Sequence, residues 1–136
     1  MTRSLEAFPT SQASAKQQSP RVAIKVKGRI LFIDIGDVVA VQAEGNYVWL
    51  QQPSGSYLLR ESISAVAEKL EPCGFIRIHR SVLVNSLFVD EITPRSAGKY
   101  GIRLKGGKEY TATRTYEKNL KSLAEFWIGT GAFFPD

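Results

Sequence analysis

The sequence predicts a mostly β protein with two short helices, and its residue pattern supports this class in three ways. Short runs rich in β-branched and aromatic residues recur along the chain, separated by Gly, Pro and Asn, as is typical of antiparallel β proteins. Only two segments, at residues 62–72 and 113–127, repeat apolar residues at helical spacing. One Cys and one His among 136 residues exclude an internal disulfide and a zinc site built from Cys and His.

Composition divides the chain into three parts. Residues 1–20 are rich in Ser, Thr, Gln and Pro without apolar periodicity, so we expect a flexible N-terminal arm. Apolar periodicity runs through residues 21–128, which we expect to form one domain, and we expect residues 129–136 to be a loose C-terminal tail. Phe133 and Phe134 of this tail could pack on the domain itself or on a partner.

Short strands are expected on both sides of the first helix, four or five before it and five after it. The first five occupy residues 21–27, 30–34, 38–43, 47–51 and 57–60. The second five occupy residues 75–78, 82–84, 89–93, 100–105 and 108–113. Gly28-Arg29 and Gly106-Gly107 are suited to tight hairpin turns, because Gly adopts the positive φ angles that such turns need.

Each predicted helix has an apolar face and a residue suited to cap its first turn. Ser62 precedes a segment with a one-sided apolar stripe formed by Ile63, Val66, Ala67 and Leu70. Thr113 precedes a closing helix whose apolar face is formed by Tyr116, Leu120, Leu123, Ala124 and Trp127. We expect the first helix to cover a sheet.

The charge of the chain favours a polyanionic partner, although a net charge of +5 also occurs in proteins that bind none. Residues 21–76 hold six basic and six acidic side chains, whereas residues 77–121 hold ten basic and four acidic ones, a net +6. No apolar run approaches the roughly 20 residues of a membrane span, and the N-terminus lacks the apolar core of a signal peptide. We therefore expect a soluble, cytoplasmic protein with no membrane segment in this chain.

The densest polar cluster lies at residues 77–85, between two predicted strands. If this tip projects, His79 offers a ring donor beside the guanidinium of Arg80. Arginine can bond bidentately to guanine O6 and N7, or bridge a phosphate, so the pair suits a DNA groove. A histidine bonded to a neighbouring backbone group is the structural alternative, and Asn85 is most simply a turn-forming residue.

Catalysis is a poorer account of the same residues. The chain lacks a G-x-S-x-G motif and a second His, and Ser81 lies only two residues from His79, a spacing that does not imply contact. Gly106-Gly107 lacks the Lys-Ser/Thr of a phosphate-binding loop. We expect no enzyme, no catalytic residues, no cofactor and no metal.

A second basic feature begins at the start of the closing helix, where free backbone N–H groups favour a phosphate. Arg114 can reach outward from this point, and Lys118 and Lys121 follow it at intervals of four and three residues. These side chains would form one basic helix edge. A solvated helix edge with no ligand is the structural alternative.

The chain from about Arg21 to Trp127 resembles the LytTR family of bacterial DNA-binding domains. The most specific stretch is F-x-R-x-H-R-S-x-x-V-N, which begins at Phe75 and ends at Asn85. The stretches at residues 35–47 and 59–63, together with Thr113-Arg114, occur in the order that the family shows. The resemblance implies an elongated fold of about ten mostly antiparallel strands in small sheets, which contacts DNA through loops.

The resemblance also implies which side chains meet DNA. Base contacts are expected from Asn46, Tyr47, His79, Arg80 and Arg114. Phosphate contacts are expected from Arg77, Ser81, Lys99, Tyr116 and Lys118. Asn suits adenine and Arg suits guanine, whereas phosphate contacts set register without reading sequence.

The function expected from these residues is sequence-specific binding of double-stranded DNA by a transcription regulator, with loops in the major groove of spaced, repeated half-sites and a possible homodimer on DNA. Two alternatives stay open. One is a protein-interaction or sensory module that has kept the fold without binding DNA. The other is a single-stranded nucleic-acid binder that stacks bases on aromatic side chains, although core packing is the simpler role for Trp49.

Overall fold

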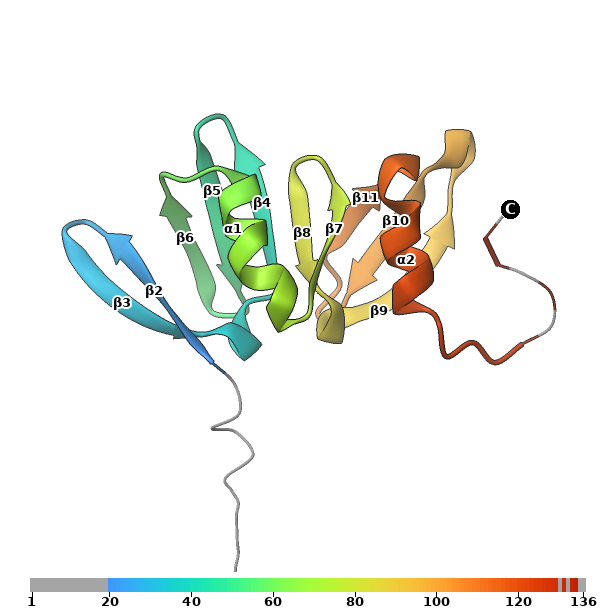
Figure 1. Ribbon diagram of the computed structural model, residues 1–136, viewed down its shortest axis with the longest axis horizontal. Coiled ribbons are helices and arrows are strands. Elements are labelled where there is room, and N and C mark those ends of the chain that lie inside the picture. The colour runs from blue at the N-terminus through green and yellow to red at the C-terminus, as the bar shows by residue number, and fades with distance from the viewer. Residues whose placement is uncertain (1–19, 130, 132, 135–136) are drawn as a thin grey trace, which may run out of the picture. The chain divides into compact units, whose positions relative to one another are not determined.

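The computed structural model describes residues 20–129, 131, 133 and 134. The predicted arm, apart from Pro20, and residues 130, 132, 135 and 136 of the predicted tail lie outside this range. The chain divides into two compact units, one up to Val38 and one from Val39 onward. As expected, it is mostly β: the described part holds ten strands in three small sheets and two short α-helices (Figure 1).

The first unit contains one antiparallel hairpin. It pairs β2 (Arg21–Val26) with β3 (Arg29–Asp34), and Val26 lies opposite Arg29. The turn is therefore Lys27-Gly28, with φ angles of +50° and +77°, one residue before the predicted turn. Two positive φ angles in succession define the hairpin turn whose twist matches that of the strands, and Gly28 occupies its second position.

The second unit contains a five-stranded antiparallel sheet in the order β6-β5-β4-β8-β7. Its strands are β4 (Ala40–Glu44), β5 (Tyr47–Gln52), β6 (Gly55–Leu59), β7 (Phe75–His79) and β8 (Val82–Asn85). The register places Val41 opposite both Leu50 and Leu83, and all three are buried. Long-range pairing of β4 with β8 thus joins the two halves of the sequence.

A three-stranded sheet completes the second unit, in the order β11-β10-β9. Its strands are β9 (Val89–Pro94), β10 (Tyr100–Leu104) and β11 (Glu109–Ala112). The predicted turn at Gly106-Gly107 is confirmed: the two glycines have φ angles of +98° and +99°, and the Leu104 N–H donates to the Lys108 carbonyl at 2.8 Å. Side chains of both sheets share one core with Leu120, which is fully buried.

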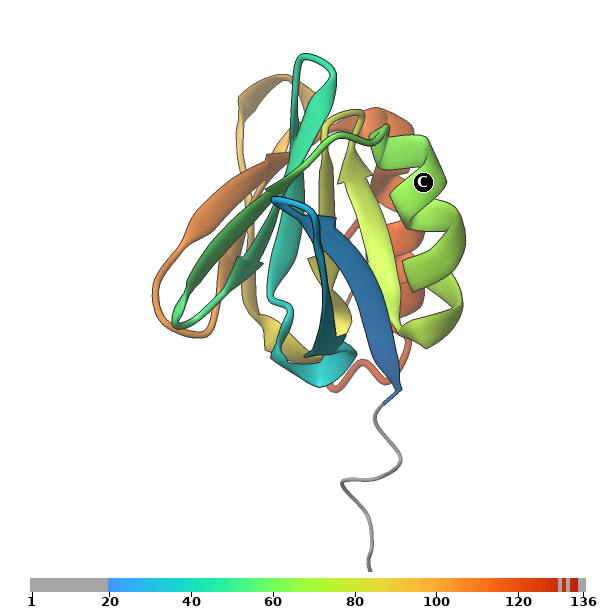
Figure 2. The same cartoon turned by 90° about the vertical axis from the view of Figure 1, so that its left-hand side faces the viewer.

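Helix α1 (Ile63–Leu70) forms as predicted. The Ser62 hydroxyl accepts the N–H of Ala65 at 3.1 Å, and Ala67 and Leu70 are buried on its inner face. The helix packs against β4, β7 and β8. Figure 2 shows α1 and α2 on the same side of the second unit. Neither helix, nor any other in the described part, is long and apolar enough to cross a membrane.

The second helix differs from the prediction at both ends. Helix α2 spans Glu117–Leu123 and is preceded by a 3₁₀ turn, Arg114–Tyr116. The Thr113 side chain makes no capping bond; its backbone carbonyl accepts the Tyr116 N–H at 3.0 Å instead. The helix stops before Trp127 because no core lies opposite its continuation, and Phe126 is 95% exposed. Capping by Thr113 and extension to Trp127 were therefore wrong.

Aromatic side chains of the C-terminal tail pack on the domain itself. Phe134 makes an edge-on contact with the buried ring of Tyr100 at 5.5 Å between centroids. The ring centroid of Phe133 lies 5.8 Å from that of Trp127 and 4.9 Å from that of Phe134. Of the two positions expected for these phenylalanines, the structure places them on the chain's own surface.

Candidate nucleic-acid interface

Two polar turns that are far apart in the sequence lie side by side at one edge of the five-stranded sheet. The turn Gly45-Asn46 joins β4 to β5, and the turn Arg80-Ser81 joins β7 to β8. Because β4 pairs with β8, the N–H of Ala43 bonds the carbonyl of Ser81 at 2.8 Å. Figure 1 shows both turns at the upper edge of the second unit.

The start of the closing helix reaches the same edge. The Thr113 N–H donates to the carbonyl of Ile78 at 3.0 Å, and the Asn119 side-chain amide donates to the carbonyl of Arg77 at 2.7 Å. These bonds attach the segment around Arg114 to the end of β7. The sheet edge that carries His79 therefore also carries the first residues of the 3₁₀ turn.

The turn between β9 and β10 completes this edge (Figure 1). Gly98 adopts a φ of +72°, and a Cβ atom there would lie 2.9 Å from Nε of Arg114. The guanidinium thus packs directly against a backbone that only glycine leaves open. Lys99 follows at once and is exposed. We call the four segments at residues 44–47, 79–81, 96–99 and 113–118 the basic edge.

The structure brings all ten predicted contact residues to the basic edge or its supporting strand, in two groups. Side chains that are exposed belong to Asn46, Tyr47, Arg80, Lys99, Arg114 and Lys118. Side chains that are partly buried belong to Arg77, His79, Ser81 and Tyr116. Whether any of them contacts a base or a phosphate stays a prediction.

Arg77 is committed to interactions within the protein. Its Nε donates to the His79 carbonyl at 3.0 Å, and its Nη2 donates to the carbonyl of Arg80. Its guanidinium also lies over the ring of Tyr116, 5.7 Å from the centroid. The guanidinium of Arg77 therefore fixes the geometry of the β7–β8 turn and connects this turn to the 3₁₀ turn that contains Tyr116.

His79 is held as a neutral ring with a defined tautomer. Its Nδ1 accepts the backbone N–H of Ser81 at 3.1 Å, and the Ser81 hydroxyl lies 2.9 Å from the same atom. An accepting Nδ1 carries no proton, so the proton of the neutral ring is on Nε2. The sequence did not imply this His–Ser contact. It closes the turn and leaves Nε2–H as a donor.

Burial and positive neighbours act together on this ring. Burial is the larger cause that lowers the pKa of His79 below its ordinary value of 6.5, and the charge of Arg80 lowers it further. Arg77 and Lys99 add smaller effects in the same direction. At neutral pH the site therefore presents a neutral hydrogen-bond donor among cations.

The free energy of unfolding should fall as pH drops below 6.5. Unfolded His79 binds a proton near its ordinary pKa, whereas the folded ring does so only at lower pH, so the unfolded state holds more protons in that window. Denaturant titrations at pH 7.5 and 5.5 test this, with His79→Gln as the comparison. His79 is the sole histidine of the chain. An identical pH dependence in both proteins would contradict the prediction.

The described basic side chains of the second unit fall into two sets, those that form ion pairs within the protein and those that do not. Arg95 pairs with Glu109 at 3.1 Å and Arg103 pairs with Glu91 at 2.7 Å. Within the part of the chain that the structure describes, no ion pair engages Arg80, Lys99, Arg114 or Lys118. The cations of the basic edge are thus available to an external anion, whereas those of the three-stranded sheet are partly neutralised.

Sequence reasoning missed the contacts of four residues that shape the basic edge: Glu44, Trp49, Gly98 and Asn119. Glu44 accepts the indole N–H of Trp49 at 2.7 Å, so the half-buried Trp49 braces the β4–β5 turn. The hairpin register pairs Glu44 with Tyr47, so Trp49, two residues further along β5, lies diagonally opposite Glu44. The register alone would therefore have predicted that the Glu44 and Trp49 side chains can touch. Gly98 and Asn119 gave no such signal, because their contacts are with residues distant in sequence.

Tyr100 and Glu117 link the tail to the start of α2. The Tyr100 hydroxyl donates to Oε2 of Glu117, and burial is the main cause that raises the pKa of Tyr100. The bond to the Glu117 carboxylate raises it further. The one carboxylate in the first turn of α2, which lies within the basic edge, is therefore hydrogen-bonded by a neutral phenol.

Comparison with known proteins finds a single family across most of the domain. Residues 28–125 match the family model described as LytTr DNA-binding domain. The sensory transduction protein LytT of Bacillus subtilis is 31% identical over 103 residues, which cover 76% of this chain and 43% of that protein. The transcriptional regulatory protein YpdB of Escherichia coli is 28% identical over 115 residues, 84% of this chain and 47% of that protein.

A solved structure has the same fold. The LytTr DNA-binding domain of a putative methyl-accepting/DNA response regulator from Bacillus cereus superposes with a TM-score of 0.67 at 18% sequence identity. The match covers 76% of this chain and 95% of that one. By contrast, the chain spans less than half the length of the two regulators named above.

Proposed function

The chain belongs to the LytTR family of DNA-binding domains, and from this we propose that it binds double-stranded DNA in a sequence-specific manner and regulates transcription. The observation that carries the proposal is the gathering of unpaired cations and the exposed Asn46 amide on one edge. Four segments separated by up to about 70 residues of sequence contribute to it. Such an edge offers cations that could bond phosphates together with guanidinium and amide groups that could bond base edges.

The basic edge offers the donors and acceptors needed for readout in the major groove. Asn46, at the tip of the β4–β5 turn, suits the bidentate bond to adenine N6 and N7. Arg80 and Arg114 suit guanine O6 and N7. His79 adds a single Nε2–H donor for N7, O6 or a phosphate oxygen. Tyr47, 40% exposed beside Asn46, would contact the same base step.

Phosphate contacts would come from the outer parts of the same edge. Lys99 and Lys118 are exposed point charges, and Lys99 follows Gly98, which lies against the Arg114 guanidinium. The Tyr116 phenol can donate to a phosphate oxygen, and the Ser81 hydroxyl can do so once it turns away from Nδ1 of His79, which keeps the Ser81 backbone N–H as its donor. Arg77, whose Nε and Nη2 hold the turn carbonyls, would support these contacts through the geometry of the β7–β8 turn.

Removing a base-reading arginine and removing a phosphate-binding lysine should have different signatures. Arg80→Ala is expected to weaken the preferred duplex by about 1–3 kcal/mol and to relax base preference, whereas Lys118→Ala should weaken all duplexes alike and lower the salt slope by about one. Titrations of specific and scrambled duplexes at several salt concentrations measure both. If the wild type binds both duplexes equally, base readout is absent.

The proposed target consists of spaced, repeated half-sites, each read by one copy of the chain, with a homodimer forming on DNA. Selection of bound duplexes from a random pool would return a repeated motif at fixed spacing. Competition with the corresponding single strand belongs to the same experiment. Stronger binding of the single strand would favour a protein that stacks bases on its aromatic side chains. We do not expect this result, because the Trp49 indole N–H is bonded to Glu44 within the protein.

A further inference from the structure

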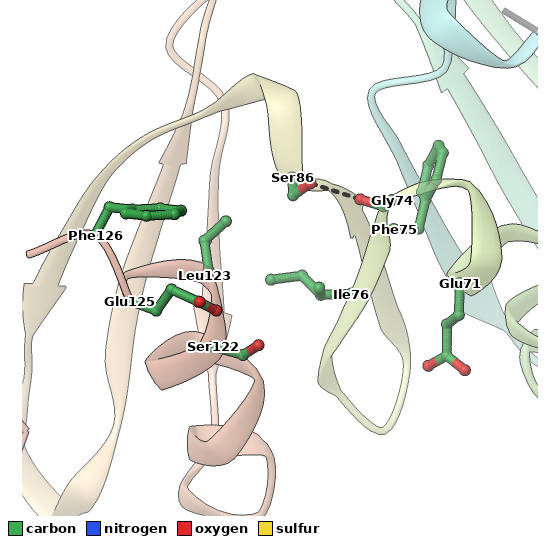
Figure 3. A pocket seen from close by; sticks show the side chains of 9 residues that line it. All are labelled: Glu71, Gly74, Phe75, Ile76, Ser86, Ser122, Leu123, Glu125 and Phe126. Atoms are coloured by element: carbon green, nitrogen blue, oxygen red, sulfur yellow. Dashed lines mark hydrogen bonds between the residues drawn. The ribbon is translucent and has the colours of Figure 1, made fainter.

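A second surface lies at the other ends of the elements that build the basic edge. A groove of about 320 Å³ runs between the start of β7 and the end of α2 (Figure 3). Ile76 and Leu123 point toward one another across it, and Phe126 stands beside them. All of these residues belong to the second unit. No role in contacting DNA is proposed above for any of them.

Strand β7 is the last strand of the five-stranded sheet, and in the described chain its outer side is unpaired where it borders this groove. The carbonyl of Gly74 accepts the Ser86 N–H at 3.0 Å, whereas the Asn85 N–H turns the other way, to the Val39 carbonyl at 3.0 Å. In an antiparallel pair these directions alternate, so the N–H and C=O of Phe75 point away from β8. Strand β7 ends the sheet order, and no strand of the described chain pairs with this side of it.

Further along β7, the backbone carbonyls on the same outer side already accept hydrogen bonds, so only a short stretch of the strand is unpaired. The carbonyl of Arg77 is taken by Asn119 and that of Ile78 by Thr113. Only the first residues of β7 thus offer backbone groups to an added strand. An incoming segment would therefore be short, with its main-chain bonds centred on Phe75.

The walls of the groove combine apolar surface with negative charge. Phe126 is 95% exposed, which is unusual for a large apolar side chain next to a concave surface. Glu71 and Glu125 line the groove and both are exposed. A chain with a net charge of +5 thus carries a local acidic and apolar site on its second unit.

We propose that this groove docks an extended segment of a partner protein that carries Lys or Arg side chains alternating with apolar ones. The segment pairs with the backbone of Phe75, packs its apolar side chains on Ile76, Leu123 and Phe126, and directs its cations to Glu71 and Glu125. Alternation supplies both kinds of contact from one strand, since successive side chains point to opposite faces.

Docking at this groove is compatible with occupation of the basic edge. Phe75 and His79 are the first and last residues of β7, and four steps of about 3.3 Å separate them by about 13 Å. Leu123 is likewise at the end of α2 that is remote from Arg114. A partner bound here would leave the four segments of the basic edge accessible.

The test uses the full 136-residue chain, labelled with ¹⁵N, and a synthetic octapeptide that alternates valine and lysine. The amide resonances of Phe75, Ile76 and Leu123 are expected to shift in a saturable manner. The same peptide with glutamate in place of lysine should bind about three- to tenfold more weakly, because exposed ion pairs contribute modestly. A valine–lysine peptide methylated on alternate amides should bind more weakly still, since it cannot pair with the edge.

Variants separate the groove from the rest of the surface. Glu125→Gln should reduce the preference for lysine over glutamate, with Glu71 retaining the rest, and Phe126→Ser should weaken both peptides; folding should be unaffected because both substituted side chains are exposed. Glu68→Gln, an exposed helix carboxylate outside the groove, is the matched control and should change nothing. Equal binding of all peptides, or shifts confined to the basic edge, would overturn the proposal. Groove resonances that shift with the concentration of the chain alone would identify a second copy as the occupant and would also overturn it.

Discussion

Arg77→Ala is expected to reduce both the stability of the fold and its affinity for DNA. The guanidinium donates to two turn carbonyls and stacks on Tyr116, and hydrogen bonds from a charged group are worth about 1.5–3 kcal/mol when they are lost from a partly buried site. The turn that carries His79 and Arg80 would then lose its fixed geometry. We expect a loss of about 1.5–3 kcal/mol in unfolding free energy and about tenfold or more in DNA affinity.

Denaturant unfolding and duplex titration, at a temperature where the variant stays folded, measure the two effects separately. Arg77→Lys keeps the charge but not the planar fork, so it should recover only a small part of either loss. Full recovery would mean that the charge alone matters. Arg103→Ala removes an exposed ion pair with Glu91 and serves as the matched control, with an expected change of at most about 1 kcal/mol.

Leu120→Ala is expected to have the largest effect on stability. Leu120 is fully buried in the core shared by the two sheets of the second unit, and truncation of a buried leucine costs about 2–5 kcal/mol. It also anchors the helix that follows Arg114 and Tyr116. At about 4 °C per kcal/mol, a loss of this size should lower the melting temperature by about 8–20 °C, as calorimetry or circular dichroism would record.

The matched control for this prediction is Leu87→Ala. Leu87 is 76% exposed, so its truncation leaves no cavity and should change the unfolding free energy by no more than about 0.5 kcal/mol. Equal destabilisation by the two substitutions would show that Leu120 does not occupy a tightly packed core. DNA binding by folded Leu120→Ala should stay close to that of the wild type, because the side chain does not reach the basic edge.

Local patterns predicted most of the secondary structure correctly. All ten strands were expected close to their observed positions, and the Ser62 cap was identified because a cap and its helix are adjacent in sequence. The errors fall where local signals compete with packing. The hairpin turn moved by one residue to Lys27-Gly28, and α2 stopped at Leu123, where the apolar repeat continues but no core remains to receive it.

The candidate site was predictable in its residue types but not in its internal contacts. The polar string around His79 predicts the turn between β7 and β8, and the basic residues near Arg114 follow from charge alone. The sequence did not show that Arg77 bonds the carbonyls of its own turn. Those carbonyls lie only two and three residues ahead of it, and an arginine in a strand has no general tendency to bond backbone groups at that spacing. Its stacking on Tyr116 depends on a contact across 39 positions.

The sequence by itself determined the β class, the turns, the charge of the second half and the resemblance to a DNA-binding family, because each of these depends on neighbouring residues. The tertiary structure alone decided that Asn46, His79, Lys99 and Arg114 share one edge, and that an acidic groove opens beside Phe75. Both results follow from the order of the strands and the docking of α2 on β7, which are set by long-range register and burial.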